Sequence, residues 1–223
     1  MTITFNEELH EYRLDGERVP SVTELIRPLT TAQYNAINPE VLRIAAERGT
    51  EVHEACEAID YGLEPEDPAP DTWGFIEAYN QFLYDHAVEY YGIEEMGACR
   101  DFPIDYAGTV DRWGLVDGEL AVVDIKTIAS PSIEQKLSVT LQTELYAWII
   151  DAKHGFEPPR KYALYLKKDG DYTLFDCNAF AEAEGVQVYN EIQRLMRLYH
   201  YTQEAKETLN EIKERHRRKK KDE

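Results

Sequence analysis

The segment that most constrains the fold of this chain is GTVDRWGLVDGELAVVDIKT, residues 108–127. Asp117 and Gly118 stand between two runs in which apolar residues alternate with other types. An Asp-Gly pair in this setting is a strong signal for a β-hairpin with a two-residue turn. We therefore expect strands at 106–116 and 119–127, joined directly by this turn.

A two-residue turn also fixes which residues face each other. If Val116 pairs with Glu119, the same register places Asp111 opposite Asp124, with their Cβ atoms about 5 Å apart. Like charges in that position destabilise a sheet unless something offsets their repulsion. Mg²⁺ or Mn²⁺ prefers oxygen ligands and retains several waters, so the pattern predicts a divalent cation between the two carboxylates.

Lys126 stands two residues after Asp124 and points to the same face of its strand. Val123 and Ile125 point the other way, into the core. A metal lowers the pKa of a bound water, and a nearby ammonium stabilises charge on a phosphate. The alternative is a structural Asp–Lys–Asp cluster on an exposed face. The metal site is favoured because Asp124 interrupts an apolar run, where an unpaired charge is costly.

Helical and strand patterns alternate along the rest of the chain. The expected elements are small β elements within 2–19, a short helix after a Ser21–Glu24 capping box, a helix from Pro39 (capped by Asn38) to about 61, a helix over 72–91, a strand at 93–102, a helix from 132 to about 155, strands at 161–167 and 172–175, and a helix over 179–199. This order predicts one mixed α/β domain at 1–212, with an antiparallel meander beside a crossover helix, followed by a basic tail at 213–223.

Charge limits how such a domain meets a polyanion. The formal net charge is −19, while residues 213–223 alone carry seven basic and three acidic groups. The body of the protein should therefore repel nucleic acid at long range. Contact with a polyanion must come from local basic groups, the tail or bound cations.

Composition favours an ordered cytoplasmic protein. Hydrophobic residues make up 43% of the chain, which is too many for a disordered one. We find no apolar run long enough for a membrane-spanning helix and no signal-peptide pattern at the start, so no membrane association is expected. Cys56, Cys99 and Cys177 lie far apart, which argues for a reducing compartment and against disulfides or a four-cysteine cluster.

Five short motifs occur in this sequence in the order and spacing that are typical of one protein family. They are PSVTELI (20–26), RGTEVH (48–53), GTVDR (108–112), VVDIKT (122–127) and the Gln142-x-x-x-Tyr146 pair. Together they resemble the PD-(D/E)XK nuclease superfamily, and within it the RecB-like branch of phage and mitochondrial single-strand exonucleases. Two departures are Val110 where proline often precedes the first acid, and the lack of the cysteines that iron–sulfur-bearing relatives use.

The resemblance implies a restriction-endonuclease-like core and metal-dependent hydrolysis of phosphodiester bonds. Asp111 and Asp124 would bind Mg²⁺ or Mn²⁺, with the carbonyl of Ile125 as a third ligand. Lys126 would position the attacking water. His53 would match the additional histidine ligand of the exonuclease branch, although a lone helical histidine is more often a surface or core residue.

The same branch has an upstream glutamate on the first strand of the core. Glu94 and Glu95 both fit that description, and the sequence does not decide between them.

A further set of polar residues is expected to contact substrate. These are Gln142, Tyr146, Ser21, Thr23 and Arg48. Gln142 and Tyr146 share a helix face and, in the family, help to hold the lysine or the nucleic acid. The capping box already accounts for Ser21, and a solvated side chain would account for Arg48.

The function that the resemblance implies is that of a DNA exonuclease acting on single strands or free ends in phage or host recombination or repair. The helical region at 39–92 would lie over the site. A homo-oligomer, or a single-strand-binding or annealing partner, would be compatible with this role. Three alternatives stay open: an endonuclease with the same site, a non-catalytic acidic mimic of nucleic acid, and a hydrolase of another phosphate ester. Polarity and the choice between DNA and RNA also stay open.

Overall fold

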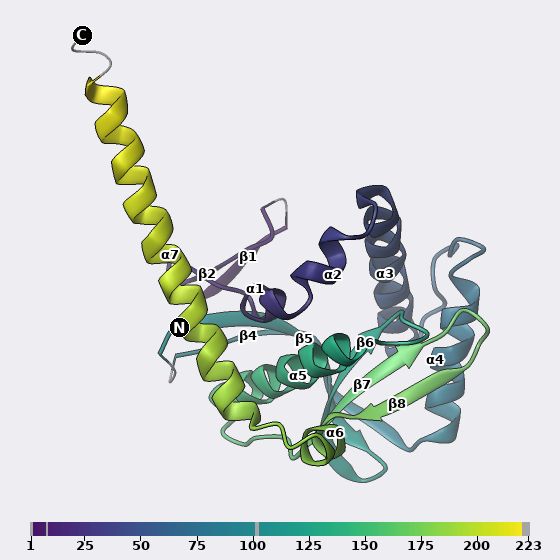
Figure 1. Cartoon of the computed structure of the whole chain (residues 1–223). Coiled ribbons are helices and arrows are strands. Elements are labelled where there is room, and N and C mark those ends of the chain that lie inside the picture. Colours follow the sequence, from purple (N-terminus) through teal and green to yellow (C-terminus); the bar gives the residue numbers. More distant parts are fainter. Residues whose placement is uncertain (1, 8, 101–102, 220–223) are drawn as a thin grey trace.

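The strands of this protein form two sheets, which are seen in a computed structural model that describes residues 2–7, 9–100 and 103–219 (Figure 1). The small sheet has the order β1-β2-β3, with bounds Ile3–Asn6, Glu11–Leu14 and Glu17–Val19. The large sheet has the order β4-β5-β6-β7-β8, with bounds Val88–Cys99, Tyr106–Val116, Glu119–Lys126, Arg160–Leu166 and Tyr172–Asp176. β6 and β7 run parallel, and the other neighbouring strands run antiparallel. The expected meander beside a crossover is confirmed.

Helices cover both faces of the large sheet (Figure 1). On one face, α3 (Pro39–Asp60) and α4 (Trp73–Asp85) pack on β6 and β7. On the other face lie α5 (Ile133–His154), α1 (Val22–Ile26) and the first part of α7 (Val188–Lys219). Because β6 is covered on both sides, its central residues are buried without alternation. An acid on this strand is therefore removed from bulk water.

The β5–β6 hairpin has the expected turn and register. Asp117 and Gly118 have φ values of 51° and 82°, the left-handed conformations that a type I′ turn requires. The ladder pairs run from Val116 with Glu119 to Arg112 with Val123. Asp111 and Asp124 occupy the next position, one step beyond the last pair.

β4 departs from regular strand geometry at Glu94, whose φ is 46°. The ladder with β5 pairs Ile93 with Arg112 and Glu95 with Val110, which leaves Glu94 outside the regular pairing. A left-handed backbone is uncommon for a residue other than glycine, and such strained positions cluster at functional sites. The Glu94 side chain lies close to Asp111 of β5.

The helix expected over 72–91 is shorter than predicted. α4 ends at Asp85, and β4 begins at Val88. The Asp117 carboxylate accepts a hydrogen bond from the backbone N–H of Ala87 at 3.0 Å, which fixes the start of the strand against the hairpin turn. A contact with a residue distant in sequence thus ends the helix. The helical region expected at 39–92 therefore ends at Asp85.

The helix expected over 179–199 is in fact two helices. α6 (Cys177–Ala183) ends, Gly185 takes a left-handed φ of 65°, and α7 begins at Val188. α7 then continues far beyond 199, through most of the tail expected at 213–223, and projects away from the sheet (Figure 1). Residues 220–223, and residues 101–102 of the strand expected at 93–102, lie outside the described part.

The expected helix caps are present. The hydroxyl of Ser21 and the carboxylate of Glu24 form both bonds of a capping box at α1. Asn38 caps α3 with Pro39 in the first turn, and Gly155, whose φ is 81°, is the C-cap of α5. Between α1 and α3 lie a 3₁₀ turn, η1 (Arg27–Leu29), and the short helix α2 (Thr31–Asn35). Among the described residues, we find no helix with the length and apolarity needed to span a bilayer.

Candidate active site

Asp111 and Asp124 lie on neighbouring strands at the end of the hairpin ladder. Both are buried, with 7% and 0% of their surface exposed. The Asp111 carboxylate accepts a hydrogen bond from the backbone N–H of Ile125 at 2.8 Å, and so leans along β6. Asp124 instead accepts a hydrogen bond from Lys126. The two acids are adjacent, but each carboxylate has its own partner.

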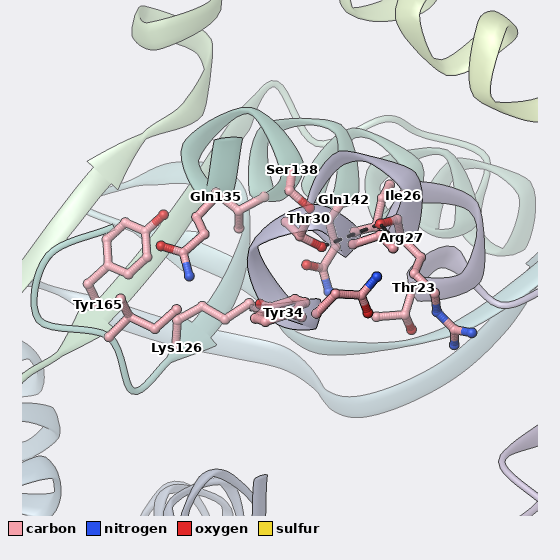
Figure 2. Close-up of a pocket in the computed structure, with 14 residues that line it drawn as sticks. Thr23, Ile26, Arg27, Thr30, Tyr34, Lys126, Gln135, Ser138, Gln142 and Tyr165 are labelled. Carbon is pink, nitrogen blue, oxygen red and sulfur yellow. Dashed lines mark hydrogen bonds between the residues drawn. The ribbon is translucent and has the colours of Figure 1, made fainter. Parts of the chain in front are cut away.

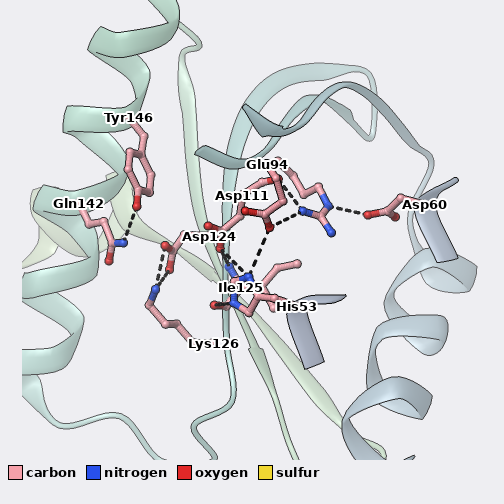
Figure 3. Close-up of polar contacts among 10 residues, drawn as sticks. His53, Asp60, Glu94, Asp111, Asp124, Ile125, Lys126, Gln142 and Tyr146 are labelled. Atoms are coloured by element: carbon pink, nitrogen blue, oxygen red, sulfur yellow. Dashed lines mark hydrogen bonds and ion pairs between the residues drawn. The ribbon is translucent and has the colours of Figure 1, made fainter. Parts of the chain in front are cut away.

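Three side chains form a compact group of metal-type donors, with one donor atom each within 4.8 Å of the others (Figure 3). They are His53 of α3, Glu94 of β4 and Asp111 of β5. His53 Nδ1 lies 3.5 Å from Glu94 Oε1 and 3.8 Å from Asp111 Oδ2. We call these three residues the donor group.

The contacts of Glu95 decide which glutamate joins this group. Its carboxylate accepts hydrogen bonds from Trp113 Nε1 at 2.7 Å and contacts Lys153 and His154 at 2.8 and 2.7 Å. These partners lie away from His53. The structure therefore brings Glu94, and not Glu95, to the donor group.

The ring of His53 is fixed by a backbone contact on its other side. Nε2 lies 3.0 Å from the carbonyl oxygen of Ile125, so it donates a proton there and leaves Nδ1 facing the carboxylates. Burial alone would lower the pKa of His53, but the carboxylates of Asp111 and Glu94 outweigh it and raise that pKa to about 8. A cation that replaced the proton on His53 Nδ1 would contact the carboxylates of Glu94 and Asp111 and the imidazole of His53.

Lys126 and Asp124 form a close ion pair beside the donor group. Lys126 Nζ donates to Asp124 Oδ1 at 2.8 Å and lies 2.7 Å from Oδ2, which is buried and accepts no hydrogen bond from the described residues. Burial raises the pKa of Asp124, and the Lys126 ammonium limits the rise. Burial opposes the charge of Lys126 too, but the carboxylates of Asp124 and Asp111 raise the pKa of Lys126 above its ordinary value. The lysine is therefore protonated at neutral pH.

Sequence reasoning missed the buried cation behind this site. Arg112 is fully buried, and its Nη1 donates to Glu94 Oε1 at 3.0 Å and to the carbonyl of Asp111 at 2.6 Å. Its Nε donates to Asp60 at 2.5 Å, and Asp60 also accepts a bond from the hydroxyl of Tyr79. An arginine within the apolar strand pattern was a signal that a buried acid lies opposite. Asp60 gave no such signal, because acids are common on helices of this chain.

The sequence of this chain matches a known protein family. A family profile described as the PD-(D/E)XK nuclease superfamily matches residues 74–222. The chain belongs to this superfamily. Its restriction-endonuclease-like core is the five-stranded mixed sheet with helices on both faces. The matched region contains Asp111, Asp124 and Lys126, whereas His53 precedes it.

The chain was also compared with solved structures and with curated proteins. A solved structure titled "Crystal structure of SSO0001" is 14% identical to this chain, with a TM-score of 0.41, and the match covers 83% of this chain and 76% of that one. No match was found among curated proteins. The superfamily assignment thus rests on the family profile.

Two residues of α5 lie beside the acids of this PD-(D/E)XK chain. Gln142 Nε2 donates to the hydroxyl of Tyr146 at 3.0 Å, and both residues are almost fully buried (Figure 3). Burial raises the pKa of Tyr146, and the charges of Asp111 and Asp124 raise it further. The phenol of Tyr146 therefore stays protonated next to the acids. Gln142 and Tyr146, predicted as substrate contacts, face the site from α5.

The remaining predicted substrate contacts, Ser21, Thr23 and Arg48, lie in three different surroundings. Thr23 lines a hollow that also contains Lys126, so it lies within reach of a substrate of a PD-(D/E)XK enzyme. The hydroxyl of Ser21 is used in the α1 cap. The guanidinium of Arg48 lies over the ring of Phe75, 5.3 Å from its centroid, and so belongs to the packing between α3 and α4. The geometry supports Thr23 more than the other two.

Proposed function

We propose that this chain is a divalent-metal-dependent DNA exonuclease of the RecB-like branch. The observation that carries the proposal is the position of the donor group beside the Asp124–Lys126 pair. Hydrolysis of a phosphodiester needs charge neutralisation on the phosphate and an oriented water. The two clusters meet these two needs from neighbouring strands.

The residues present fit a small divalent cation. The donor group offers two carboxylates and one imidazole within 4.8 Å, and the carbonyl of Ile125 lies at its edge. Asp124 Oδ2 is buried and makes no hydrogen bond with the described residues, but it lies 2.7 Å from Lys126 Nζ, so a cation bound there would share this carboxylate with the ammonium. Oxygen-rich donors suit Mg²⁺ and Mn²⁺, and the imidazole shifts the preference toward Mn²⁺.

The side chains have separate parts in the reaction. A bound divalent cation would supply a Lewis acid that lowers the pKa of water and offsets phosphate charge. Glu94 and Asp111 are held in place for this by Arg112 and by the N–H of Ile125. Lys126, charged and held by Asp124, orients the attacking water and stabilises negative charge on a phosphate oxygen. Product would then leave with a 5′-phosphate.

The choice of exonuclease over endonuclease rests on the resemblance to the RecB-like branch. Its upstream motifs fall in α1 and α3; α3 contributes His53 to the donor group, and α1 contributes Thr23 to the hollow that Lys126 also lines. A free or single-stranded DNA end is the proposed substrate, and recombination or repair in a phage or its host is the proposed setting. A second copy, or a single-strand-binding or annealing protein, is the proposed kind of partner.

A digestion panel tests the proposal. Linear single-stranded, linear duplex and circular single-stranded DNA, each labelled, would be incubated with the protein in Mg²⁺ or Mn²⁺. We expect loss of label from linear DNA, no cutting of the circle, and no activity in EDTA. Asp124→Ala is the matched inactive control, and an unchanged rate in that variant would refute the site.

Other outcomes separate the alternatives. Cutting of the circle would indicate an endonuclease with the same site. Intact DNA in both metals, combined with hydrolysis of a nucleotide ester, would indicate a different phosphate ester as substrate. Intact DNA and no hydrolysis at all would indicate a non-catalytic protein.

A further inference from the structure

A hollow of about 420 Å³ opens beside Lys126, outside the donor group (Figure 2). It lies between the α1–η1–α2 segment on one side and α5 on the other, with β7 at one end. His53, Glu94 and Asp111 do not line it, whereas Lys126 and Gln142 do. Its volume is in the range of pockets that hold small ligands.

The charge of this hollow differs from that of the chain as a whole. Although the chain carries a formal net charge of −19, none of the described residues that line the hollow is acidic. Two of them, Arg27 and Lys126, are cationic, although Lys126 is paired with Asp124 outside the lining. A cavity with cations and no acids in so acidic a protein favours an anionic ligand.

Tyr165 supplies an independent sign that a ligand binds here. Its side chain lines the hollow next to Lys126, with which it pairs across β6 and β7, so both point to the same face. The residue is 2% exposed, and its hydroxyl finds no hydrogen-bond partner among the described residues. A buried hydroxyl without a partner is costly, and a ligand group in the hollow would satisfy it.

The other walls suit a nucleobase. The ring of Tyr34, 40% exposed, lies near the Lys126 side chain and offers a face for stacking (Figure 2). The carboxamide of Asn35 can donate and accept hydrogen bonds at a base edge, whereas Gln135, whose oxygen accepts the Ser132 N–H in the α5 cap, can donate from its amide nitrogen. Aromatic faces combined with amides and cations are the means by which proteins hold unpaired nucleotides.

We propose that this hollow binds the unpaired nucleotide next to the bond that is cut, with its base against Tyr34 and Tyr165 and its phosphate toward Lys126. This rests on the proposed function and narrows its substrate to a DNA end with at least one unpaired nucleotide. A base paired within a duplex has its Watson–Crick edge occupied and its faces stacked on neighbouring pairs, so it offers neither to the hollow. The hollow therefore selects against blunt duplex ends.

Binding without cleavage tests this directly. The full-length protein in EDTA would be titrated into a fluorescent oligothymidylate, with blunt duplex DNA as competitor. We expect Tyr165→Phe to weaken binding by about fivefold, since it removes one hydroxyl. Tyr34→Ala should weaken it by about fivefold or more through loss of stacking. The matched controls are Tyr172→Phe, whose hydroxyl bonds Asp85, and Tyr84→Ala, which is 86% exposed; both should bind as the wild type does.

Three results would overturn the proposal: no binding by the wild type, equal affinities of the two hollow variants and their controls, or duplex that competes as well as single strand. Failure of the proposed function would look different. If the two hollow variants lost affinity as expected but no DNA were cut in Mg²⁺ or Mn²⁺, the nucleotide site would stand and the nuclease activity would not.

Discussion

Arg112 and Asp60 form a buried ion pair, with 2.5 Å between Arg112 Nε and Asp60 Oδ2 and side-chain exposures of 0% and 3%. The pair joins β5 to the last residue of α3. Because the same guanidinium also bonds Glu94, the position of one donor of the candidate metal site depends on an acid that is not itself a donor.

Asp60→Asn should therefore destabilise the fold. It leaves the guanidinium of Arg112 buried with one partner charge fewer, and breaking a buried ion pair costs about 3–5 kcal/mol. Urea denaturation measures the loss. The control is Glu119→Gln, which breaks the exposed pair with Arg160 and should cost less than about 1 kcal/mol. Equal losses in the two variants would contradict the role of the buried pair.

Glu94→Gln and Glu95→Gln should differ in metal affinity. Only Glu94 belongs to the donor group, so its loss should weaken Mn²⁺ binding by about tenfold or more, as even changes around a metal site do. Glu95 bonds Trp113 instead, and its variant should bind Mn²⁺ as the wild type does. Isothermal titration calorimetry gives both affinities, and a loss confined to Glu95→Gln would reverse the assignment.

Metal should also stabilise the protein. The donor group exists only in the folded chain, so Mn²⁺ at about 100 times its dissociation constant should add about 2.7 kcal/mol to the free energy of unfolding. Thermal melts with and without MnCl₂ detect this as a rise in Tm. Asp111→Asn should abolish the rise. An identical Tm in both conditions for the wild type would argue against a metal site.

Lys126→Ala should slow cleavage strongly while the fold remains. The Lys126 ammonium is paired with the Asp124 carboxylate at the site. Removing one electrostatic group of this kind lowers the reaction rate by about 10²–10³-fold. Single-turnover cleavage of a labelled strand measures the rate, and circular dichroism checks the fold. Lys167→Ala, which breaks an ion pair with Asp171 outside the site, is the control. A wild-type rate for Lys126→Ala would remove the lysine from the mechanism.

The hairpin turn gives a pH-dependent contribution to stability. The hydrogen bonds from His86 and from the N–H of Ala87 lower the pKa of Asp117 below its usual value. A lowered carboxyl pKa contributes stability that is present above the unfolded-state pKa and is lost as pH falls through the folded-state value. We therefore expect the wild type to exceed Asp117→Asn in stability at pH 5, by less than about 1 kcal/mol because the site is exposed.

Urea denaturation across a range of pH checks this, because asparagine keeps the turn conformation and removes only the charge. The difference between the two proteins should vanish at strongly acidic pH. A difference that grows as the pH falls would contradict the sign.

The turn chemistry of Asp117 and Gly118 allowed the register of β5 and β6 to be predicted through Arg112 and Val123, because the constraint is local. The choice between Glu94 and Glu95 could not be made in that way. The β4–β5 ladder shifts between Tyr90 and Gly92 and Glu94 has a left-handed backbone, so the alternation of faces cannot be counted along β4 from sequence.

The helix boundaries failed for a related reason. α4 stops shortly before Ala87, whose N–H donates to the carboxylate of Asp117 in a distant turn. No residue within 72–91 predicts that contact. The break before α7 could have been found, because Gly185 lies inside the pattern that was interpreted as one helix. Local signals were therefore reliable at turns and caps, and unreliable where tertiary contacts end an element.

The burial of β6 on both faces has a consequence for motion. Its amides are bonded to two neighbouring strands, so they should exchange hydrogen with solvent only in rare, large openings of the domain. α2 has five residues and an exposed surface, and its amides should exchange far sooner. Asp124 and Lys126 thus stand on a strand held from both sides, while α2, on the opposite wall of the hollow beside Lys126, can adjust more readily when the end of a DNA strand arrives.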